Sequence, residues 1–345
     1  MKLQDYNFQL PEELIASFPL KERSKSKLLV LEKLISDRYF IDLPELLEPN
    51  DVLVINDTAV FKARFLGKKA SGSRVEVLIE RVINESLVIA QTKSNSKLKE
   101  GDKIFLSKHL HFLTLTKKRQ RFSEFKFSLS VEEAIKLYGK VPLPPYIKRE
   151  ASELDLQRYQ TIYADFQKCH SVAAPTAGLH FDQALLDSLT KKGVKIAKVT
   201  LHVGMGTFKP IREPKIKDHH MHKEQIEISK VAADVINETK TTKGRIICVG
   251  TTSLRCIESV CKENNGKLKP FKGETNLFIY PGYKFKITDI LITNFHLPFS
   301  SLLLLVSAFA GHDRIMLAYQ HAVKEGYRFY SYGDSMIIYP ERTIL

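Results

Sequence analysis

Residues 195–208 read KIAKVTLHVGMGTF, and this stretch decides the fold. Its first half, Lys195–Leu201, has the apolar character of a buried strand, and the chain changes at His202 to small and polar residues. The same change from an apolar run to a small polar loop recurs at Ile246–Val249 before GTTSLR and at 287–293 before NFHLPFSS. Strands that alternate with helical patterns predict a wound α/β sheet. Such sheets bind ligands at the carboxyl ends of their strands, so these loops are expected to form one cleft.

Helical patterns separate the strand-like runs. The segment 181–192 places three leucines on one face and is followed by Gly193, which is typical of a helix end. Further helices are expected over 227–239 and 252–262, and Ser300 or Ser301 is expected to cap an apolar helix over 302–310. The main part of the chain is therefore expected to be an α/β domain.

A different pattern occupies the region from about residue 60 to residue 127. It contains six short strand-like runs, at 64–66, 75–80, 87–92, 103–106, 113–116 and 122–127. Short strands separated by turn residues predict a small β-barrel or sandwich. A helix over 131–138 and a proline-rich connector follow. We expect an α/β main domain, 1–59 and 149–345, with an inserted all-β, barrel-like domain, 60–148.

The composition indicates a folded protein with an anionic partner. The chain has 345 residues, enough for two domains, with 43% hydrophobic and 27% charged residues. Its formal net charge of +14 favours a partner such as nucleic acid, with a generally lysine-rich composition as the alternative. Between Lys93 and Lys126 there are ten Lys or Arg residues against three acidic ones. The candidates for RNA contacts within this stretch are Lys117, Lys118, Arg119 and Arg121. A solvated barrel surface over an aromatic core is the competing interpretation.

The four cysteines and the apolar segments bear on the compartment. Cys169, Cys248, Cys256 and Cys261 form no C-x-x-C pair, which suits a reducing compartment. The N-terminal residues lack the apolar segment of a secretory signal, and the run 302–310 is too short to span a bilayer. We therefore expect a soluble, cytoplasmic protein that does not bind membranes.

Histidines and hydroxyl residues supply the candidate chemistry. His180, His202 and His296 each adjoin a predicted loop, and a neutral imidazole can exchange a proton near neutral pH. A single histidine is more often structural, but three that converge would favour catalysis. Gly250 and the hydroxyl residues after it fit an anion pocket at a helix start, although hydroxyls also cap ordinary helices. On the following helix, Arg255 is expected to pair with Glu258.

Other common sites find little support. The stretch 218–224, DHHMHKE, has its ligand-type residues too close together for a typical metal site, so no metal is expected. The G-x-G-x-x-G motif is absent, so a nicotinamide cofactor is not implied. No G-x-S-x-G motif indicates an esterase nucleophile.

Taken in order, many uncommon strings of this chain are familiar. They include YNFQLPEELIA, VLVINDT, PLPPYI, SVAAPTAGLHF, LHVGMGTFKPI, VGTTSLRCIES and TNFHLPFSSLLLLVSAFAG. With them the chain resembles, nearly end to end, the S-adenosylmethionine:tRNA ribosyltransferase-isomerase family of queuosine biosynthesis. The resemblance implies an α/β domain with an inserted barrel. It also implies transfer and isomerisation of the ribosyl moiety of S-adenosylmethionine onto the aminomethyl group of 7-aminomethyl-7-deazaguanine, at the wobble position of tRNA. Epoxyqueuosine-tRNA, adenine and methionine would be the products.

Residue roles follow as hypotheses from this chemistry. A base would open the ribose beside the sulfonium, and adenine needs a proton as it leaves, so His180, His202 and His296 are the candidate proton carriers. The residues expected to hold the methionine carboxylate or the ribose hydroxyls are Gly204, Gly206, Thr207, Thr251, Thr252 and Ser253. Asn294 would orient the donor or the base, and Glu224 or Asp334 would bind the donor's ammonium group. S-adenosylmethionine enters as a co-substrate, and no permanently bound cofactor is implied.

Two positions depart from the family pattern, and three other functions compete with it. Ala59 stands where a basic residue is common, which weakens a phosphate clamp there, and His170 stands where glycine is usual. The competing functions are a non-catalytic tRNA-binding protein, an S-adenosylmethionine-dependent tRNA methyltransferase and a metal hydrolase. A methyltransferase would need a glycine-rich first turn that this chain lacks. We expect the protein to be a monomer.

Overall fold

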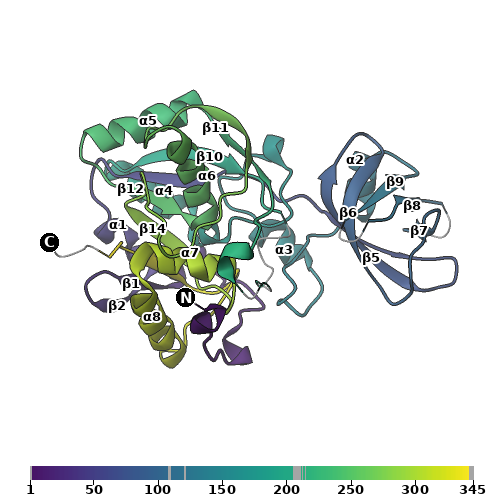
Figure 1. Ribbon diagram of the computed structural model, residues 1–345, viewed down its shortest axis with the longest axis horizontal. Helices are drawn as coiled ribbons and strands as arrows, with labels where there is room; N and C mark the ends of the chain where they lie inside the picture. Colours follow the sequence, from purple (N-terminus) through teal and green to yellow (C-terminus); the bar gives the residue numbers. More distant parts are fainter. Residues whose placement is uncertain are drawn as a thin grey trace.

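The computed structural model describes residues 2–107, 110–119, 122–204, 211, 213 and 215–341. Figure 1 shows a large α/β part and, at the other end of the long axis, a β-barrel. The barrel strands lie between Arg64 and Phe127, and the sheet strands come from the chain before and after them. The predicted fold class, an α/β domain with an inserted barrel, is confirmed. The domain boundaries at 59/60 and 148/149 stay predictions.

The α/β domain contains a nine-stranded mixed sheet in the order β13-β11-β10-β3-β12-β14-β15-β1-β2. Its strands are β1 (Lys27–Leu31), β2 (Ile35–Tyr39), β3 (Val52–Asn56), β10 (Lys195–Leu201), β11 (Glu224–Ile228), β12 (Ile246–Val249), β13 (Phe271–Thr275), β14 (Ile290–Asn294) and β15 (Ser335–Ile338). The four central strands β10, β3, β12 and β14 are parallel. All residues of β3 and β14 are buried, as expected for strands covered on both faces.

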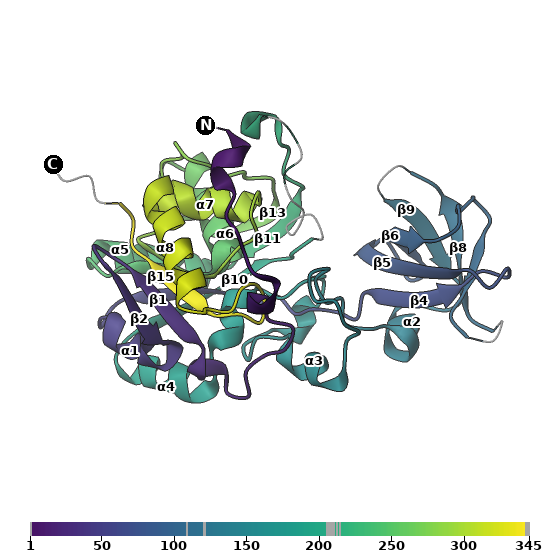
Figure 2. The ribbon, with the colours of Figure 1, turned by 90° about the horizontal axis from the view of Figure 1, so that it is seen from below.

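Helices cover both faces of this sheet. The helices outside the barrel region are α1 (Leu43–Leu46), α3 (Glu153–Arg158), α4 (Gln183–Lys191), α5 (Lys230–Thr241), α6 (Gly250–Glu263), α7 (Ser301–Ala310) and α8 (His312–Lys324). Because strand side chains alternate, Val52 and Val54 of β3 join the core under α5 to α8, while Leu53 and Ile55 join the core under α1 and α4. Figure 2 shows α1 and α4 on one side of the sheet and α7 on the other.

The inserted region forms a closed barrel in the order β4-β5-β6-β9-β8-β7. Its strands are β4 (Arg64–Lys68), β5 (Arg74–Val82), β6 (Leu87–Ser94), β7 (Lys103–Phe105), β8 (Phe112–Lys117) and β9 (Ser123–Phe127), and α2 (Val131–Tyr138) follows them. Phe125 and Phe127 are buried in the barrel core. Phe125, within the basic stretch, and Phe127, directly after it, therefore pack inward, as the competing interpretation of that stretch expected.

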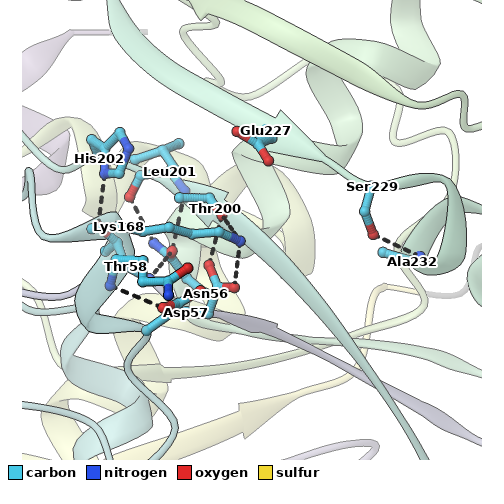
Figure 3. Close-up of polar contacts among 12 residues, drawn as sticks. Asn56, Asp57, Thr58, Lys168, Thr200, Leu201, His202, Glu227, Ser229 and Ala232 are labelled. Atoms are coloured by element: carbon cyan, nitrogen blue, oxygen red, sulfur yellow. Dashed lines mark hydrogen bonds and ion pairs between the residues drawn. The ribbon is translucent and has the colours of Figure 1, made fainter.

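Side-chain caps account for the starts of several helices, and one predicted helix start is wrong. Asp182 caps α4 by accepting a hydrogen bond from the Leu185 amide, and Ser300 caps α7 in the same way. The helix predicted over 227–239 begins only at Lys230, where Ser229 caps it (Figure 3). Glu227 belongs to β11 instead, because this segment pairs with β10 on one side and β13 on the other.

Candidate functional site

The polar loops predicted to converge do lie at one edge of the sheet. Because β3, β10, β12 and β14 are parallel, the residues after them share the carboxyl edge. The strand β15 begins at that edge, where Ser335 pairs with Asn294. Asn56 fixes the edge locally: its Oδ1 accepts from the Leu201 amide at 3.1 Å, and its Nδ2 donates to the Leu201 carbonyl at 3.0 Å (Figure 3). The ends of β3 and β10 are therefore held together.

A cavity lies at this edge, and we call it the strand-end cavity. It is lined by residues of segments 174–177, 250–252, 293–297 and 330–331, together with Tyr146 and Val203. The segment 174–177 reads APTA, and its small side chains leave the space open. The α6 helix begins at Gly250, so its amino-terminal amides face the same region. The sequence predicted Thr251, Thr252, Asn294 and His296 for such a site, and all four line it.

Two polar atoms of this lining have no partner in the described part of the chain. They are the Oγ1 atom of Thr252 and the Oδ1 atom of Asn294, and both are buried. Buried polar atoms without hydrogen bonds are uncommon and costly, so these atoms fit contacts to a bound molecule. Ser253 differs, because its Oγ donates to the Val249 carbonyl at 2.8 Å and its side chain completes the helix turn.

Asn294 is oriented by its neighbours. Its Nδ2 is surrounded by three acceptors: His180 Nε2 at 3.0 Å, the Tyr330 carbonyl at 3.2 Å and the Asp334 carbonyl at 3.3 Å. The nitrogen must therefore lie on that side, which leaves Oδ1 as the unpaired acceptor. The other ring nitrogen of His180, Nδ1, lies 2.7 Å from Ser26 Oγ. Both ring nitrogens are thus engaged, and His180 can position Asn294.

Burial sets the protonation of the two histidines near this cavity. Burial, together with the positive charges of the nearby Arg328 and Arg23, lowers the pKa of His180 to about 3. Burial also lowers the pKa of His296 to about 3. His296 lines the cavity, and its Nε2 lies 3.0 Å from Thr293 Oγ1. Both imidazoles are neutral at pH 7, and His296 can therefore accept a proton from a bound molecule.

A larger cleft of about 1240 Å³ lies between the α/β domain and the barrel, and we call it the interdomain cleft. Its lining includes His202 and Gly204 from the sheet edge and Glu80 and Arg119 from the barrel. Val203 lines both this cleft and the strand-end cavity, so the two are neighbours. His202 therefore does not share the cavity with His296 but lies beside it. Gly206, Thr207 and Arg121 lie outside the described residues.

Hydrogen bonds hold His202 at the cleft. Its Nδ1 lies 2.8 Å from Thr58 Oγ1, and Thr58 Oγ1 donates to the Lys168 carbonyl at 3.4 Å (Figure 3). Burial and the neighbouring His170 lower the pKa of His202 to about 4, while Asp57 acts in the opposite direction. The arrangement that satisfies both contacts puts a proton on Nδ1 and leaves the Nε2 lone pair free to accept another proton.

A partly buried ion pair fixes the segment that carries His170. Lys168 Nζ lies 2.8 Å from Asp57 Oδ2, and Thr200 Oγ1 donates to Asp57 Oδ1 at 2.6 Å (Figure 3). This places His170 edge-on against His202, with ring centroids 5.3 Å apart. The His170 departure from the family pattern therefore lies at the site. Ala59, the other departure, is fully buried.

The two carboxylates predicted to bind an ammonium group are already engaged. Glu224 forms a short ion pair with Arg255 and accepts from the Gly204 amide at 3.3 Å. Asp334 accepts from the Lys27 and Arg328 amides and pairs with the Arg328 side chain, and it does not line the strand-end cavity. The predicted Arg255–Glu258 pair is wrong, because Glu258 instead accepts from the amides of 286–288.

The remaining predicted residues lie on the barrel, and Arg119 also lines the interdomain cleft. Lys117, Lys118 and Arg119 are exposed near the end of β8 in the barrel.

Within the described residues, no group of three or more His, Cys, Asp or Glu side chains is placed to hold a metal ion. No single described helix has the length and apolar character to cross a bilayer; α7 and α8 meet that test only together, and they are bent by 115°.

Sequence reasoning missed Thr58, Ser26 and Tyr146. Thr58 follows β3 in the string NDT, and this polar end to an apolar run was the available signal. Ser26 and Tyr146 carry no such signal. Ser26 reaches the site through His180, more than 150 positions away, and Tyr146 lines the strand-end cavity, where its hydroxyl contacts the equally distant Ser331.

Three comparisons with known proteins each match nearly the whole chain. The sequence model of the family described as "Queuosine biosynthesis protein" matches residues 3–338. A curated protein of Acinetobacter baylyi named S-adenosylmethionine:tRNA ribosyltransferase-isomerase is 46% identical over 340 residues, which is 98% of this chain and 99% of that protein. The crystal structure of S-adenosylmethionine tRNA ribosyltransferase from Thermotoga maritima has a TM-score of 0.56 and 32% identity, over 97% of this chain and 99% of that one.

Proposed function

Because the chain belongs to the queuosine biosynthesis protein family, we propose that it transfers and isomerises the ribosyl moiety of S-adenosylmethionine onto tRNA. The acceptor is the aminomethyl group of 7-aminomethyl-7-deazaguanine at the wobble position, and adenine and methionine leave. The family resemblance seen in the sequence is thereby confirmed, and the relative from A. baylyi carries the name of this activity.

One observation carries the assignment of the donor site. Thr252 Oγ1 and Asn294 Oδ1 are buried in the strand-end cavity without protein partners. The ribose hydroxyls of S-adenosylmethionine donate hydrogen bonds and match these atoms. Thr251 and the first amides of α6 would complete the contacts. Gly204, Gly206 and Thr207, which follow β10 in the sequence, are proposed to contact the same donor.

The proton carriers are proposed from their positions. His296 is proposed as the base that opens the ribose because it lines the cavity and its neutral imidazole carries a lone pair; the burial that keeps it neutral also makes it a weak base. His202 lies at the neighbouring cleft, where it can receive the proton of the attacking amine. His180 retains a part as the residue that positions Asn294. Glu224 and Asp334 remain proposed contacts of the donor's ammonium group, although their oxygens already accept protein hydrogen bonds.

The acceptor is proposed to enter through the interdomain cleft. The cleft has room for a nucleobase with its ribose, and it adjoins the cavity at Val203. Lys117, Lys118 and Arg119 are exposed on the barrel, where they can approach phosphates of the anticodon arm. A base held in the cleft would thus present its aminomethyl group toward the donor.

Product analysis tests the proposal. Purified protein is incubated with S-adenosylmethionine and precursor tRNA, and small molecules are separated by chromatography. Free adenine and methionine in equal amounts are expected, and His296→Ala should lower their formation at least a hundredfold. Release of S-adenosylhomocysteine would indicate a methyltransferase instead. No saturable binding of S-adenosylmethionine would indicate a tRNA-binding protein without catalysis.

A further inference from the structure

A third cavity has His180 in its wall, and its charged lining residues other than this histidine are all arginines. Arg23, Arg158 and Arg328 line it, and we call it the arginine pocket. They come from three distant parts of the chain: the segment before β1, the end of α3, and the loop before β15. The described lining residues include no aspartate or glutamate. His180 forms part of the wall, and Ser331 lines both this pocket and the strand-end cavity.

Main-chain carbonyls accept hydrogen bonds from some, but not all, of the N–H groups of Arg23 and Arg158. Arg23 donates to the carbonyls of Leu179, Gln157 and Gln160 at 2.9 to 3.1 Å. Arg158 donates to the carbonyls of Leu20 and Lys21 at 2.7 and 3.0 Å. In the described part of the chain, neither arginine forms an ion pair, and Arg158 Nε is buried without a partner. These carbonyl dipoles do not neutralise the two positive charges.

Arg328 adds a third cation with one carboxylate partner. Its side chain pairs with Asp334 at 3.1 Å. Burial and the nearby Arg158 lower the pKa of Arg23 to about 10, an effect that Tyr332, Tyr163 and Asp182 partly oppose. Arg23 and Arg158 are thus close enough to repel each other. Since a guanidinium has more N–H donors than these contacts use, all three retain capacity for a further acceptor.

We infer that Arg23, Arg158 and Arg328 form a binding site for an oxyanion, a carboxylate or a phosphate group. Planar guanidinium groups bind such oxygens in pairs, and an anion here would remove the repulsion between the cations. The inference rests on the proposed function, which supplies two possible sources of the oxyanion. One is the carboxylate of the methionyl part of the donor, which could extend from the strand-end cavity past Ser331. The other is a backbone phosphate of the tRNA. Arg23 and Arg158 also join the segment 19–26 to 157–160, and a purely structural role is the competing explanation.

Equilibrium binding separates these explanations. Sulfate is titrated against wild-type protein at constant ionic strength, with the thermal midpoint as the readout, and the same titration is repeated with Arg158→Gln. The control variant is Lys21→Gln, which removes an exposed charge from the adjoining segment but does not line the pocket. Sulfate is expected to raise the midpoint of the wild type and of Lys21→Gln, and to have at least tenfold weaker affinity for Arg158→Gln. Equal affinity in all three proteins would overturn the inference.

Two further arms identify the source of the oxyanion. If the donor carboxylate occupies the pocket, sulfate competes with S-adenosylmethionine but not with decarboxylated S-adenosylmethionine. In that case Arg158→Gln lowers the affinity for S-adenosylmethionine about tenfold and leaves the affinity for the decarboxylated compound unchanged. If a tRNA phosphate occupies it, both nucleosides bind unchanged, while tRNA binding weakens and its salt dependence falls. The wild-type competition needs no variant, so a misfolded Arg158→Gln would not leave the question open. The sulfate affinities test the pocket and do not depend on catalysis. Adenine release tests the proposed function, so failure of one can be told apart from failure of the other.

Discussion

Asn294 Nδ2 donates a hydrogen bond to His180 Nε2 at 3.0 Å, and this contact joins the end of β14 to the short 3-10 helix Thr176–His180 before α4. It fixes the direction of the Asn294 amide, so that Oδ1 is left unpaired at the strand-end cavity. The same imidazole forms part of the wall of the arginine pocket. The orientation of one cavity atom therefore depends on a histidine that does not line that cavity.

Replacement of His180 should affect binding of the donor more than proton transfer. In His180→Ala, the Asn294 amide loses one of its three acceptors and can rotate, which should raise KM for S-adenosylmethionine about tenfold, the cost of one misplaced buried hydrogen bond. The pH dependence of kcat should stay as in the wild type. His321→Ala, a change at a histidine remote from both pockets that pairs with Asp37, serves as the control. A lost or displaced limb of the kcat profile would instead identify His180 as a proton carrier.

Thr58 should act on the reaction through His202. Thr58→Val removes the oxygen that accepts from His202 Nδ1, so the ring can turn and Nε2 loses its orientation toward the cleft. We expect kcat to fall about tenfold while the affinity for S-adenosylmethionine stays within twofold of the wild-type value. Thr58→Ser retains the hydroxyl and should restore most of kcat. If Ser and Val variants were equally impaired, the threonine methyl group, and not the hydrogen bond, would be the important feature.

The sequence predicted the location of the site better than its contacts. The strand ends near Leu201, Val249 and Thr293 were readable because apolar runs stop abruptly there, and parallel strands bring such ends to one edge; the third strand extends one residue further than predicted, to Asn294. The hydrogen-bond partners of the site histidines could not be predicted from the sequence. His180 meets Ser26, and His202 meets Thr58, across 154 and 144 positions, and no local pattern encodes such distances.

Arg255 illustrates why local rules fail inside a sheet. The spacing to Glu258 favoured a pair on one helix. The structure instead pairs Arg255 with Glu224, on a strand that precedes the helix by a long interval, while Glu258 accepts amides of the 286–288 loop. Strand order decided the partner, and the order β13-β11-β10 is a tertiary property. The same order made Glu227 part of a strand, where its periodicity had favoured a helix.

The Arg255–Glu224 pair should be essential to stability. Both side chains are 2% exposed, so Arg255→Met would leave a buried carboxylate without its cation. Such a change should reduce the free energy of unfolding by about 3 to 5 kcal/mol. The double variant Arg255→Met/Glu224→Gln should recover a large part of that loss, because the uncompensated charge is gone. Urea unfolding of the wild type, both single variants and the double variant completes the cycle. A fully additive cycle would contradict coupling between the two residues.

The buried histidines should make stability depend on pH. His296 has a pKa of about 3 in the folded protein, against 6.5 when unfolded. The unfolded chain therefore binds a proton between these values that the folded chain does not, and stability falls as the pH drops below 6.5. Each such group contributes about 1.4 kcal/mol per pH unit in this window. Thermal midpoints from pH 7 to pH 4 should fall less steeply for His296→Gln than for the wild type. Parallel curves would show that His296 is not buried in its neutral form.

The exposed cations of the barrel should set the salt dependence of tRNA binding. The triple variant Lys117→Gln/Lys118→Gln/Arg119→Gln removes three charges near the end of β8 and leaves the barrel core untouched. Each phosphate contact that is lost should lower the slope of log K against log salt by about 0.7 to 0.9. The matched control, Lys33→Gln/Lys262→Gln/Lys324→Gln, removes the same charge from exposed positions of the α/β domain. If the barrel contacts phosphates, the first variant flattens the slope and the control retains it. Equal slopes for both variants would mean that net charge, and not a located RNA surface, attracts the tRNA.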